Sequence, residues 1–339
     1  MSSVRILLGT AVMTAVLLVT AGCGSTRTTA SSSDPSNPSG AAPQLPPTTG
    51  NFDYQLGGAY VPARGVTVVT RDSTSKPAKG VYSICYVNGF QTQPGSHWPT
   101  SLILKTKSGT PLIDPGWPDE HIIDISTPAK RKTAAARIAK STDLCASRGF
   151  EAVEFDNLDS YSYSYSRSEG ALTLSQAVLF AALLVKHAHS KGLASSQKNT
   201  GELDTRGKTQ IGFDFATTEE CDAYNECGLF TEVYGAHVLD VEYSDNLLGT
   251  FAQVCARKAT PPQTILRDRF LTTPWGTAYV YKTCRPGISS GEATRSSKQK
   301  INMTDKLNDA VASPYRDSRE LCRTIRRRAD YVCPQDASL

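Results

Sequence analysis

The chain has 339 residues, of which 39% are hydrophobic and 20% are charged. These fractions are those of an ordinary globular protein and exclude a chain that is disordered along most of its length. Its formal net charge of +4 is small, and a basic C-terminal stretch supplies it. The rest of the chain is nearly neutral, which argues against a nucleic-acid-binding surface. This length accommodates one large domain or two small ones.

The N-terminus has the pattern of an export signal. Arg5 precedes an apolar run from Ile6 to Val19 that is shorter than a membrane span. Small residues then lead into Cys23, as in a bacterial lipobox. We therefore expect residues 1–22 to be a lipoprotein signal peptide, with Cys23 lipidated and the protein held outside the cytoplasm on the cell membrane. The alternative is a plain signal peptide that is cut nearby and releases a secreted protein.

Residues 23–50 are rich in Ser, Thr and Pro and carry almost no charge. Such a composition cannot bury a core, so it predicts a disordered tether between the anchor and the folded part. At the other end of the chain, residues 291–339 are predicted to be a basic, helical C-terminal extension. Its cluster of positive charge lies at Arg323–Arg328.

Nine cysteines are present. Setting Cys23 aside leaves an even number, which predicts disulfides in an oxidising compartment. Pairs close in sequence are the simplest expectation, namely Cys221–Cys227, Cys255–Cys284 and Cys322–Cys333. A metal site is the rival, but no CxxC or HExxH spacing occurs and the histidines are scattered. We therefore expect neither a metal nor a cofactor.

From residue 51 onward, short apolar runs alternate with helix-like segments, a pattern typical of βα units. The predicted strands cover residues 66–70, 80–87, 121–125, 149–156, 193–198, 212–217, 236–242 and 263–266. Eight such strands predict a (β/α)8 TIM barrel over residues 51–290. A doubly wound open sheet is the alternative, but no glycine-rich phosphate loop follows any strand.

Two helices between these strands are clearly marked. Thr127 and Pro128 form a start signal for a helix that Gly149 ends. A second helix is expected from Leu172 to Lys191. Its predicted buried stripe is Leu174, Val178, Leu179, Ala182 and Leu183.

Polar residues end almost every predicted strand. They are Asp72, Asn88, Asp124, Glu154, Asp156, Lys198, Asn199, Glu219, Glu242 and Asp268. In a barrel, the carboxyl ends of all strands meet on one rim, where active sites are built. Glu154 and Asp156 are two apart in a strand, so their side chains point the same way. These positions predict a carboxylate-rich site at the barrel mouth.

Several carboxylates without a metal-ligand pattern favour acid–base chemistry. Cleavage of a glycosidic bond needs two carboxyl groups, one to protonate the leaving oxygen and one to act as nucleophile or base. Serine-hydrolase chemistry is the competitor. No GxSxG motif is present, however, and both His187 and His189 fall inside a predicted helix.

Several motifs resemble glycoside hydrolase family 114 over about residues 52–284. They include Ile84-Cys-Tyr-Val-Asn-Gly, Val153-Glu-Phe-Asp-Asn, Gln197-Lys-Asn, Glu219-Glu-Cys and Val241-Glu-Tyr. The resemblance implies a (β/α)8 barrel and endo-α-1,4-polygalactosaminidase activity on galactosamine-rich polysaccharide. It also implies Asp156 as nucleophile and Glu219 as acid/base. Phe155 and Thr218 depart from the family pattern and leave the substrate preference open.

Further substrate contacts are expected at Tyr86, Asp124, Glu154, Asn157, Lys198, Asn199, Glu242 and Tyr243. The carboxylates among them would make the cleft acidic, which suits a polymer bearing ammonium groups. Lys198 either serves catalysis or forms a structural ion pair with Glu154. We expect a monomer whose partners are a polysaccharide and the membrane, not nucleic acid. A carbohydrate-binding lipoprotein without activity and a glycosidase for another sugar are the rivals.

Overall fold

The structure is a computed structural model that describes residues 42–114, 116–164 and 172–285. One sheet contains nine strands in chain order. The strands are β1 Asn51–Gln55, β2 Val66–Asp72, β3 Tyr82–Asn88, β4 Ala152–Asp156, β5 Ala194–Lys198, β6 Phe215–Glu219, β7 Val238–Tyr243, β8 Gln263–Arg267 and β9 Tyr281–Thr283. Strands β1 to β8 are parallel, and β9 runs antiparallel to β8. The prediction of an eight-stranded parallel barrel is confirmed.

Two of the strand assignments are corrected. Strand β1 was not predicted, because it carries polar Asn51, Asp53 and Gln55, all of which are buried in the fold. The predicted third strand at 121–125 is wrong. That segment makes only isolated antiparallel bridges, to residues of the same long connection between β3 and β4. Its apolar residues are buried, which explains their strand-like pattern.

The barrel closes between β1 and β8 through side chains. In the described residues, no backbone ladder joins these two strands. Instead the Arg267 guanidinium donates to the Tyr54 carbonyl and lies 3.2 Å from Asp53. The Tyr281 hydroxyl donates to the Phe52 carbonyl at 2.8 Å. The ring of strands is therefore nearly closed.

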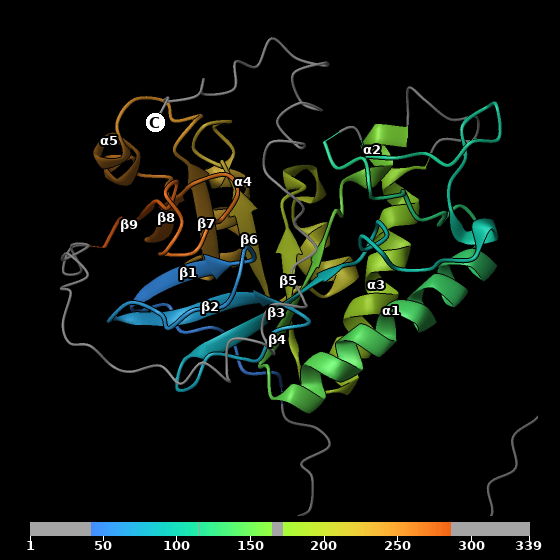
Figure 1. The fold of residues 1–339 in the computed structure, drawn as a ribbon, viewed down its shortest axis with the longest axis horizontal. Coiled ribbons are helices and arrows are strands. Elements are labelled where there is room, and N and C mark those ends of the chain that lie inside the picture. The colour runs from blue at the N-terminus through green and yellow to red at the C-terminus, as the bar shows by residue number, and fades with distance from the viewer. Residues whose placement is uncertain (1–41, 115, 165–171, 286–339) are drawn as a thin grey trace, which may run out of the picture. The chain divides into compact units, whose positions relative to one another are not determined.

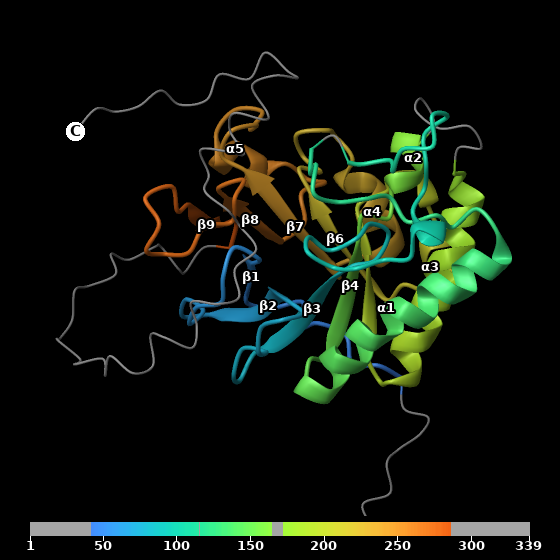
Figure 2. The same cartoon turned by 45° about the vertical axis from the view of Figure 1, so that its right-hand side comes forward.

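Helices cover part of this barrel. The longest are α1 Pro128–Arg148 and α3 Leu174–Ser190, which lie side by side next to β3, β4 and β5 (Figure 1 and Figure 2). The others are α2 Ser160–Ser164, α4 Cys227–Tyr234, α5 Phe251–Ala256, the short turns η1 Thr100–Leu102 and η2 Gly201–Leu203, and η3 Gly207–Ile211. Loops without helices connect β1 to β2 and β2 to β3. No described helix is long and apolar enough to cross a membrane.

The ends of α1 follow the sequence signals. The Thr127 hydroxyl accepts from the Lys130 amide, and Gly149 caps the other end with a left-handed φ of 86°. The predicted stripe of α3 is wrong, since Leu179 and Leu183 are 52% and 40% exposed. Residues 177–185 of this helix form an unbroken apolar run, so periodicity did not identify the buried face. That face consists of Ala177, Phe180, Ala181, Leu184, Val185 and Ala188.

Alternation along the strands separates two cores. On β4, Val153 and Phe155 pack in the outer core beneath α1 and α3. Ala152 points into the barrel interior with Phe52 and Ile84. Glu154 and Asp156 continue this inner row toward the carboxyl end of the strand. The phase of each strand therefore decides which polar side chains reach the mouth.

Three disulfides link the described cysteines. Cys221–Cys227 and Cys255–Cys284 confirm two of the predicted pairs. Cys85–Cys145 is a long-range bond between β3 and α1 that was not predicted. This disulfide content is typical of an extracytoplasmic protein. The predicted signal peptide, Cys23, most of the predicted tether, the predicted C-terminal extension and the predicted pair Cys322–Cys333 lie outside the described residues.

Candidate active site

Lys198 is the centre of the polar cluster at the barrel mouth. Its ammonium lies 2.9 Å from Asp156 Oδ1, 3.2 Å from Glu219 Oε2 and 3.6 Å from Glu154 Oε1. These four residues come from the carboxyl ends of β4, β5 and β6. The predicted convergence of strand ends thus brings three carboxyl groups around one ammonium.

Three tyrosine hydroxyls each bind one of these carboxylates. Tyr86 donates to Asp156 Oδ2 at 2.6 Å, and Tyr243 donates to Glu219 Oε1 at 2.5 Å. The third donor lies deeper and contacts Glu154 Oε1 at 2.6 Å; it is Tyr54 of β1. Sequence reasoning missed this last residue because it missed the strand. The signal that could have found it is the alternation of apolar Phe52 and Tyr54 with polar neighbours, which is the pattern of a strand.

The two carboxylates nearest the ammonium are more exposed than the third. The side chains of Asp156 and Glu219 are 17% and 28% exposed, whereas that of Glu154 is fully buried. Asn199 holds Glu219 from a second side, because its amide donates to Oε2 at 3.2 Å and its oxygen accepts from the Glu219 backbone at 2.8 Å. Substrate can therefore reach Asp156 and Glu219 more readily than Glu154.

Electrostatics separate the acids further. Burial acts to raise the pKa of Asp156, but the Lys198 ammonium and the Tyr86 hydroxyl hold that pKa below its ordinary value. Burial raises the pKa of Glu154 despite the nearby ammonium. Burial alone would lower the pKa of Lys198, but its three carboxylate neighbours raise it well above the usual range. Asp156 is thus held ionised, and Lys198 stays charged.

Left-handed backbone conformations follow three adjacent strands at this rim. Asn157 after β4, Asn199 and Thr200 after β5, and Glu220 after β6 have φ values between 45° and 64°. Such conformations are unfavourable for residues other than glycine and cluster at functional sites. The chain turns sharply after each strand, which leaves the preceding polar side chain at the mouth.

A second acidic group lies beside Asp156, and sequence reasoning did not identify it. Glu120 Oε2 accepts from Asn88 at 2.6 Å and from Asn157 at 3.4 Å. Burial raises the pKa of Glu120 to about 8 and that of Asp159 to about 6, in both cases with a contribution from Asp156. Glu120 belongs to the long loop after β3, where no periodic pattern indicates which residues turn inward.

Asp124 and Glu242 are not brought into the Lys198 cluster. Asp124 lies before α1, where it pairs with Lys130 at 2.5 Å and accepts from Ser126. Glu242 is fully buried and accepts from the Asp222 backbone at 2.8 Å, on the opposite face of β7 from Tyr243. We therefore do not retain these two as substrate contacts. Asp124 was expected at the mouth because residues 121–125 were wrongly assigned to a strand. Glu242 was expected there because the sequence does not show which residues of β7 face inward.

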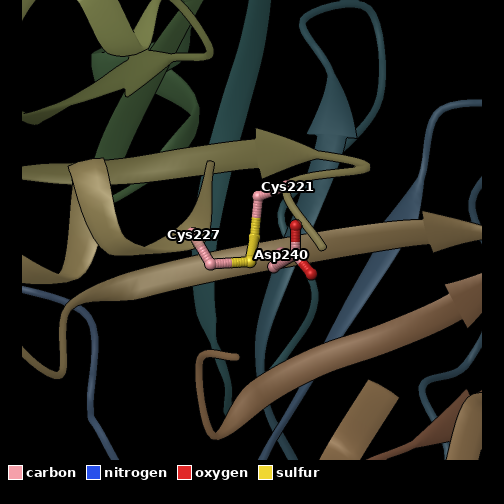
Figure 3. A group of neighbouring side chains, drawn as sticks. All are labelled: Cys221, Cys227 and Asp240. Carbon is pink, nitrogen blue, oxygen red and sulfur yellow. A yellow bond between two sulfur atoms is a disulfide. The ribbon is translucent and has the colours of Figure 1, made fainter. Parts of the chain in front are cut away.

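Behind the mouth, Asp240 lies near the sulfur atoms of Cys221 and Cys227 (Figure 3). The three side chains have the spacing of a metal-ligand group, but the sulfurs are joined in a disulfide. A disulfide offers no thiolate to a metal. Burial raises the pKa of Asp240 to about 7, so a bound proton suffices to neutralise it near neutral pH.

Comparisons with known proteins bear on the family and the fold. The comparison with curated proteins gave no match. Among solved structures, the chain is similar to Aspergillus fumigatus Ega3 in complex with galactosamine, with a TM-score of 0.58 and 18% identity over 73% of this chain and 100% of that chain. It is also similar to the glycoside hydrolase domain of PelA from Pseudomonas aeruginosa, with a TM-score of 0.47 and 11% identity over 66% of this chain and 96% of that one.

The likeness to Ega3 shows the fold. The model of glycoside-hydrolase family GH114 matches residues 32–289, which is most of the chain. That range contains the whole barrel and every residue of the Lys198 cluster. The protein therefore belongs to glycoside-hydrolase family GH114 and is a glycoside hydrolase.

Proposed function

We propose that the enzyme hydrolyses α-1,4-linked galactosamine-containing polysaccharide within the chain, with Asp156 as nucleophile and Glu219 as acid/base. The observation that carries this proposal is the shared ammonium of Lys198, which lies within 3.2 Å of both carboxylates at the open end of the barrel. Two carboxyl groups in different environments are what cleavage of a glycosidic bond requires.

The environments support the division of roles. Asp156 is kept ionised by Lys198 and Tyr86, as a nucleophile must be. Glu219 is the more exposed of the two, so a leaving-group oxygen can approach it to take a proton. Lys198, Tyr86 and Tyr243 act on these carboxylates as positioning residues.

The distance between the carboxylates favours retention of configuration. Asp156 Oδ1 and Glu219 Oε2 lie 2.9 and 3.2 Å from one nitrogen atom, so they are at most about 6 Å apart. Retaining glycosidases hold their carboxyl groups about 5–5.5 Å apart, whereas inverting enzymes leave about 6.5–9.5 Å for a water molecule. We therefore propose a covalent glycosyl–Asp156 intermediate, in which the nucleophile displaces the protonated leaving oxygen and water later releases the sugar.

The carboxyl groups around the site suit an amino-sugar substrate. Glu154, Asp156 and Glu219 surround one lysine, and Glu120 and Asp159 lie beside Asp156. Carboxyl oxygens at the mouth can accept hydrogen bonds from the ammonium groups of such a polymer. The galactosamine bound in the structure of Ega3 is consistent with this substrate class.

Two substitutions test the catalytic pair. Asp156→Asn and Glu219→Gln should each abolish hydrolysis of de-N-acetylated galactosaminogalactan, with circular dichroism spectra unchanged. Asp143→Asn, which alters a half-exposed carboxylate on α1, is the control and should retain activity. Retained activity in either site variant would remove its assigned role. Cleavage of a different polymer by the parent enzyme would correct the substrate and leave the roles in place.

We further propose that the protein is exported and anchored by a lipid on Cys23. The N-terminal sequence up to Cys23 and the three disulfides of the described residues support this. Expression of the full chain in a bacterium should give a membrane-bound form whose N-terminal peptide carries fatty acids by mass spectrometry. Cys23→Ala should shift the protein to the soluble fraction. An unmodified, soluble parent protein would contradict the anchor.

A further inference from the structure

The loop between β8 and β9, residues 268–280, is fixed at both ends. The Asp268 carboxylate accepts from the backbone amides of Thr272 at 2.9 Å and Val280 at 3.4 Å. The Arg267 guanidinium donates to the carbonyls of the same two residues, at 2.9 and 3.0 Å. Four bonds from two buried charged side chains thus define the position of the loop.

The loop also packs directly on the turn after β1. A Cβ atom on Gly57 would lie 2.4 Å from the Leu271 carbonyl oxygen, so the two backbones touch. Beyond this contact, the Tyr60 ring packs edge-on against the rings of Trp275 and Tyr279, at centroid distances of 6.5 and 6.1 Å. The tip of the loop therefore rests on a buried aromatic support.

Trp275 stands at this tip and is 78% exposed. Phe270, near the start of the same loop, is 41% exposed, and Val61 on the neighbouring turn is 90% exposed. Large apolar side chains that are held rigidly in solvent mark binding surfaces more often than scattered small ones do. The exposed patch is small, however. A stable protein–protein interface buries about 800 Å² on each partner, far more than one indole offers.

The loop between β8 and β9 reaches the active site through Arg269. The Tyr243 hydroxyl binds Glu219 at 2.5 Å, and the Arg269 guanidinium lies 4.5 Å from the centre of the Tyr243 ring. Arg269 precedes Phe270 in the chain. The loop follows the carboxyl end of β8, so it belongs to the same rim as Lys198. The loop between β8 and β9 is drawn in orange in Figure 2.

We propose that Trp275 forms an outer sugar subsite for the polysaccharide chain that Asp156 and Glu219 cleave. The apolar face of a pyranose ring packs on the indole, and an ammonium group of an amino sugar is attracted to its π face. This inference rests on the proposed function, because it needs a polymer in the cleft. It explains why an aromatic side chain is held open at a fixed place on the rim.

Binding to an inactive enzyme tests the subsite. In a Glu219→Gln background, the affinity for α-1,4-galactosamine disaccharide and octasaccharide is measured by calorimetry, with and without Trp275→Ala. We expect the octasaccharide to bind about fivefold more weakly without the indole and the disaccharide to bind equally. Trp275→Phe should recover most of the loss. Leu179→Ala, which removes an exposed apolar side chain from α3, is the control and should change neither affinity.

Each other outcome overturns the inference. Equal octasaccharide affinities with and without Trp275, beside parent binding that increases with oligomer length, would refute the subsite and leave the proposed function intact. No binding of either oligomer to the Glu219→Gln protein would refute the substrate class, and the subsite with it. If Trp275→Ala instead lowers the sedimentation coefficient and leaves sugar binding unchanged, the indole contacts a second copy of the chain.

Discussion

Replacing Lys198 by methionine removes the ammonium shared by the catalytic carboxylates and keeps the length of the side chain. Lys198 Nζ is 2.9 Å from Asp156 Oδ1 and 3.2 Å from Glu219 Oε2. Opposite unit charges about 4 Å apart attract by ~4 kcal/mol at an effective dielectric constant of ~20. One pKa unit corresponds to ~1.4 kcal/mol. The pKa of Asp156 should therefore rise by about 2–3 units, since burial then acts without its counterweight.

The assay measures kcat/KM as a function of pH for the parent enzyme and for the Lys198→Met variant. The proposed nucleophile must be ionised, and the pKa of Asp156 lies below the ordinary 3.8, so the activity of the parent enzyme should persist to low pH. In Lys198→Met, the acidic limb should move to higher pH by the same 2–3 units as the pKa. Lys191→Met, which removes a surface lysine paired with Asp143 at 3.0 Å, is the matched control. An acidic limb that does not move in a folded Lys198→Met protein would refute the role given to the ammonium.

The Lys198→Met substitution should also change how Tm depends on pH. In the parent, the lowered pKa of Asp156 stabilises the fold above the ordinary pKa, and this contribution is lost as pH falls through the folded-state pKa. In Lys198→Met the buried carboxyl has a raised pKa instead, so rising pH destabilises the fold. The difference in Tm between the two proteins should therefore be small near pH ~3 and grow toward pH ~7.

Three further substitutions separate the roles of the remaining groups. Tyr86→Phe removes the 2.6 Å hydrogen bond to ionised Asp156 and should lower kcat/KM about 10- to 100-fold, since such bonds contribute about 1.5–3 kcal/mol; an unchanged value would contradict it. Glu154→Gln keeps the neutral form that burial favours and should stay within about tenfold of the parent; inactivity as complete as that of Asp156→Asn would count against this. The pKa of Glu242 is raised by burial to about 8 from 4.5, so the parent loses stability as pH rises through that interval; Glu242→Gln should flatten the fall of Tm, and parallel curves would disprove it.

The Lys198 cluster was predictable because a barrel makes strand ends converge. Asp156, Lys198 and Glu219 each end a recognisable strand, so their proximity follows from topology alone. Which side of the sheet each residue faces depends on the phase of its strand, and the sequence does not give that phase. For this reason Glu242 was predicted to lie in the mouth, whereas its side chain lies outside it. The position of Glu120 depends on how a long loop folds back on the barrel, which no local pattern specifies.

Strand β1 shows a different limit. Its sequence has polar residues at alternate positions, the pattern of a half-exposed edge, yet every residue is buried. Asp53 can be buried because Gln55 and Tyr60 donate to it from its own part of the chain and Arg267 pairs with it across the closure of the barrel. Arg267 is distant in sequence, and Tyr60 lies outside any regular pattern. A buried polar strand is therefore visible only after the contacts that satisfy it are known.

The burial of Glu154 is what allows one lysine to serve the two carboxyls that we propose as the catalytic pair. Its side chain is fully buried, one oxygen accepts from Tyr54, and the other has no hydrogen-bond partner in the described residues. Burial raises its pKa, so a proton, not Lys198, neutralises it over the pH range below that pKa. The ammonium is then free to balance ionised Asp156. An exposed, ionised Glu154 would instead compete for Lys198 and raise the pKa of Asp156, so the innermost acid supports the catalytic pair by being neutral.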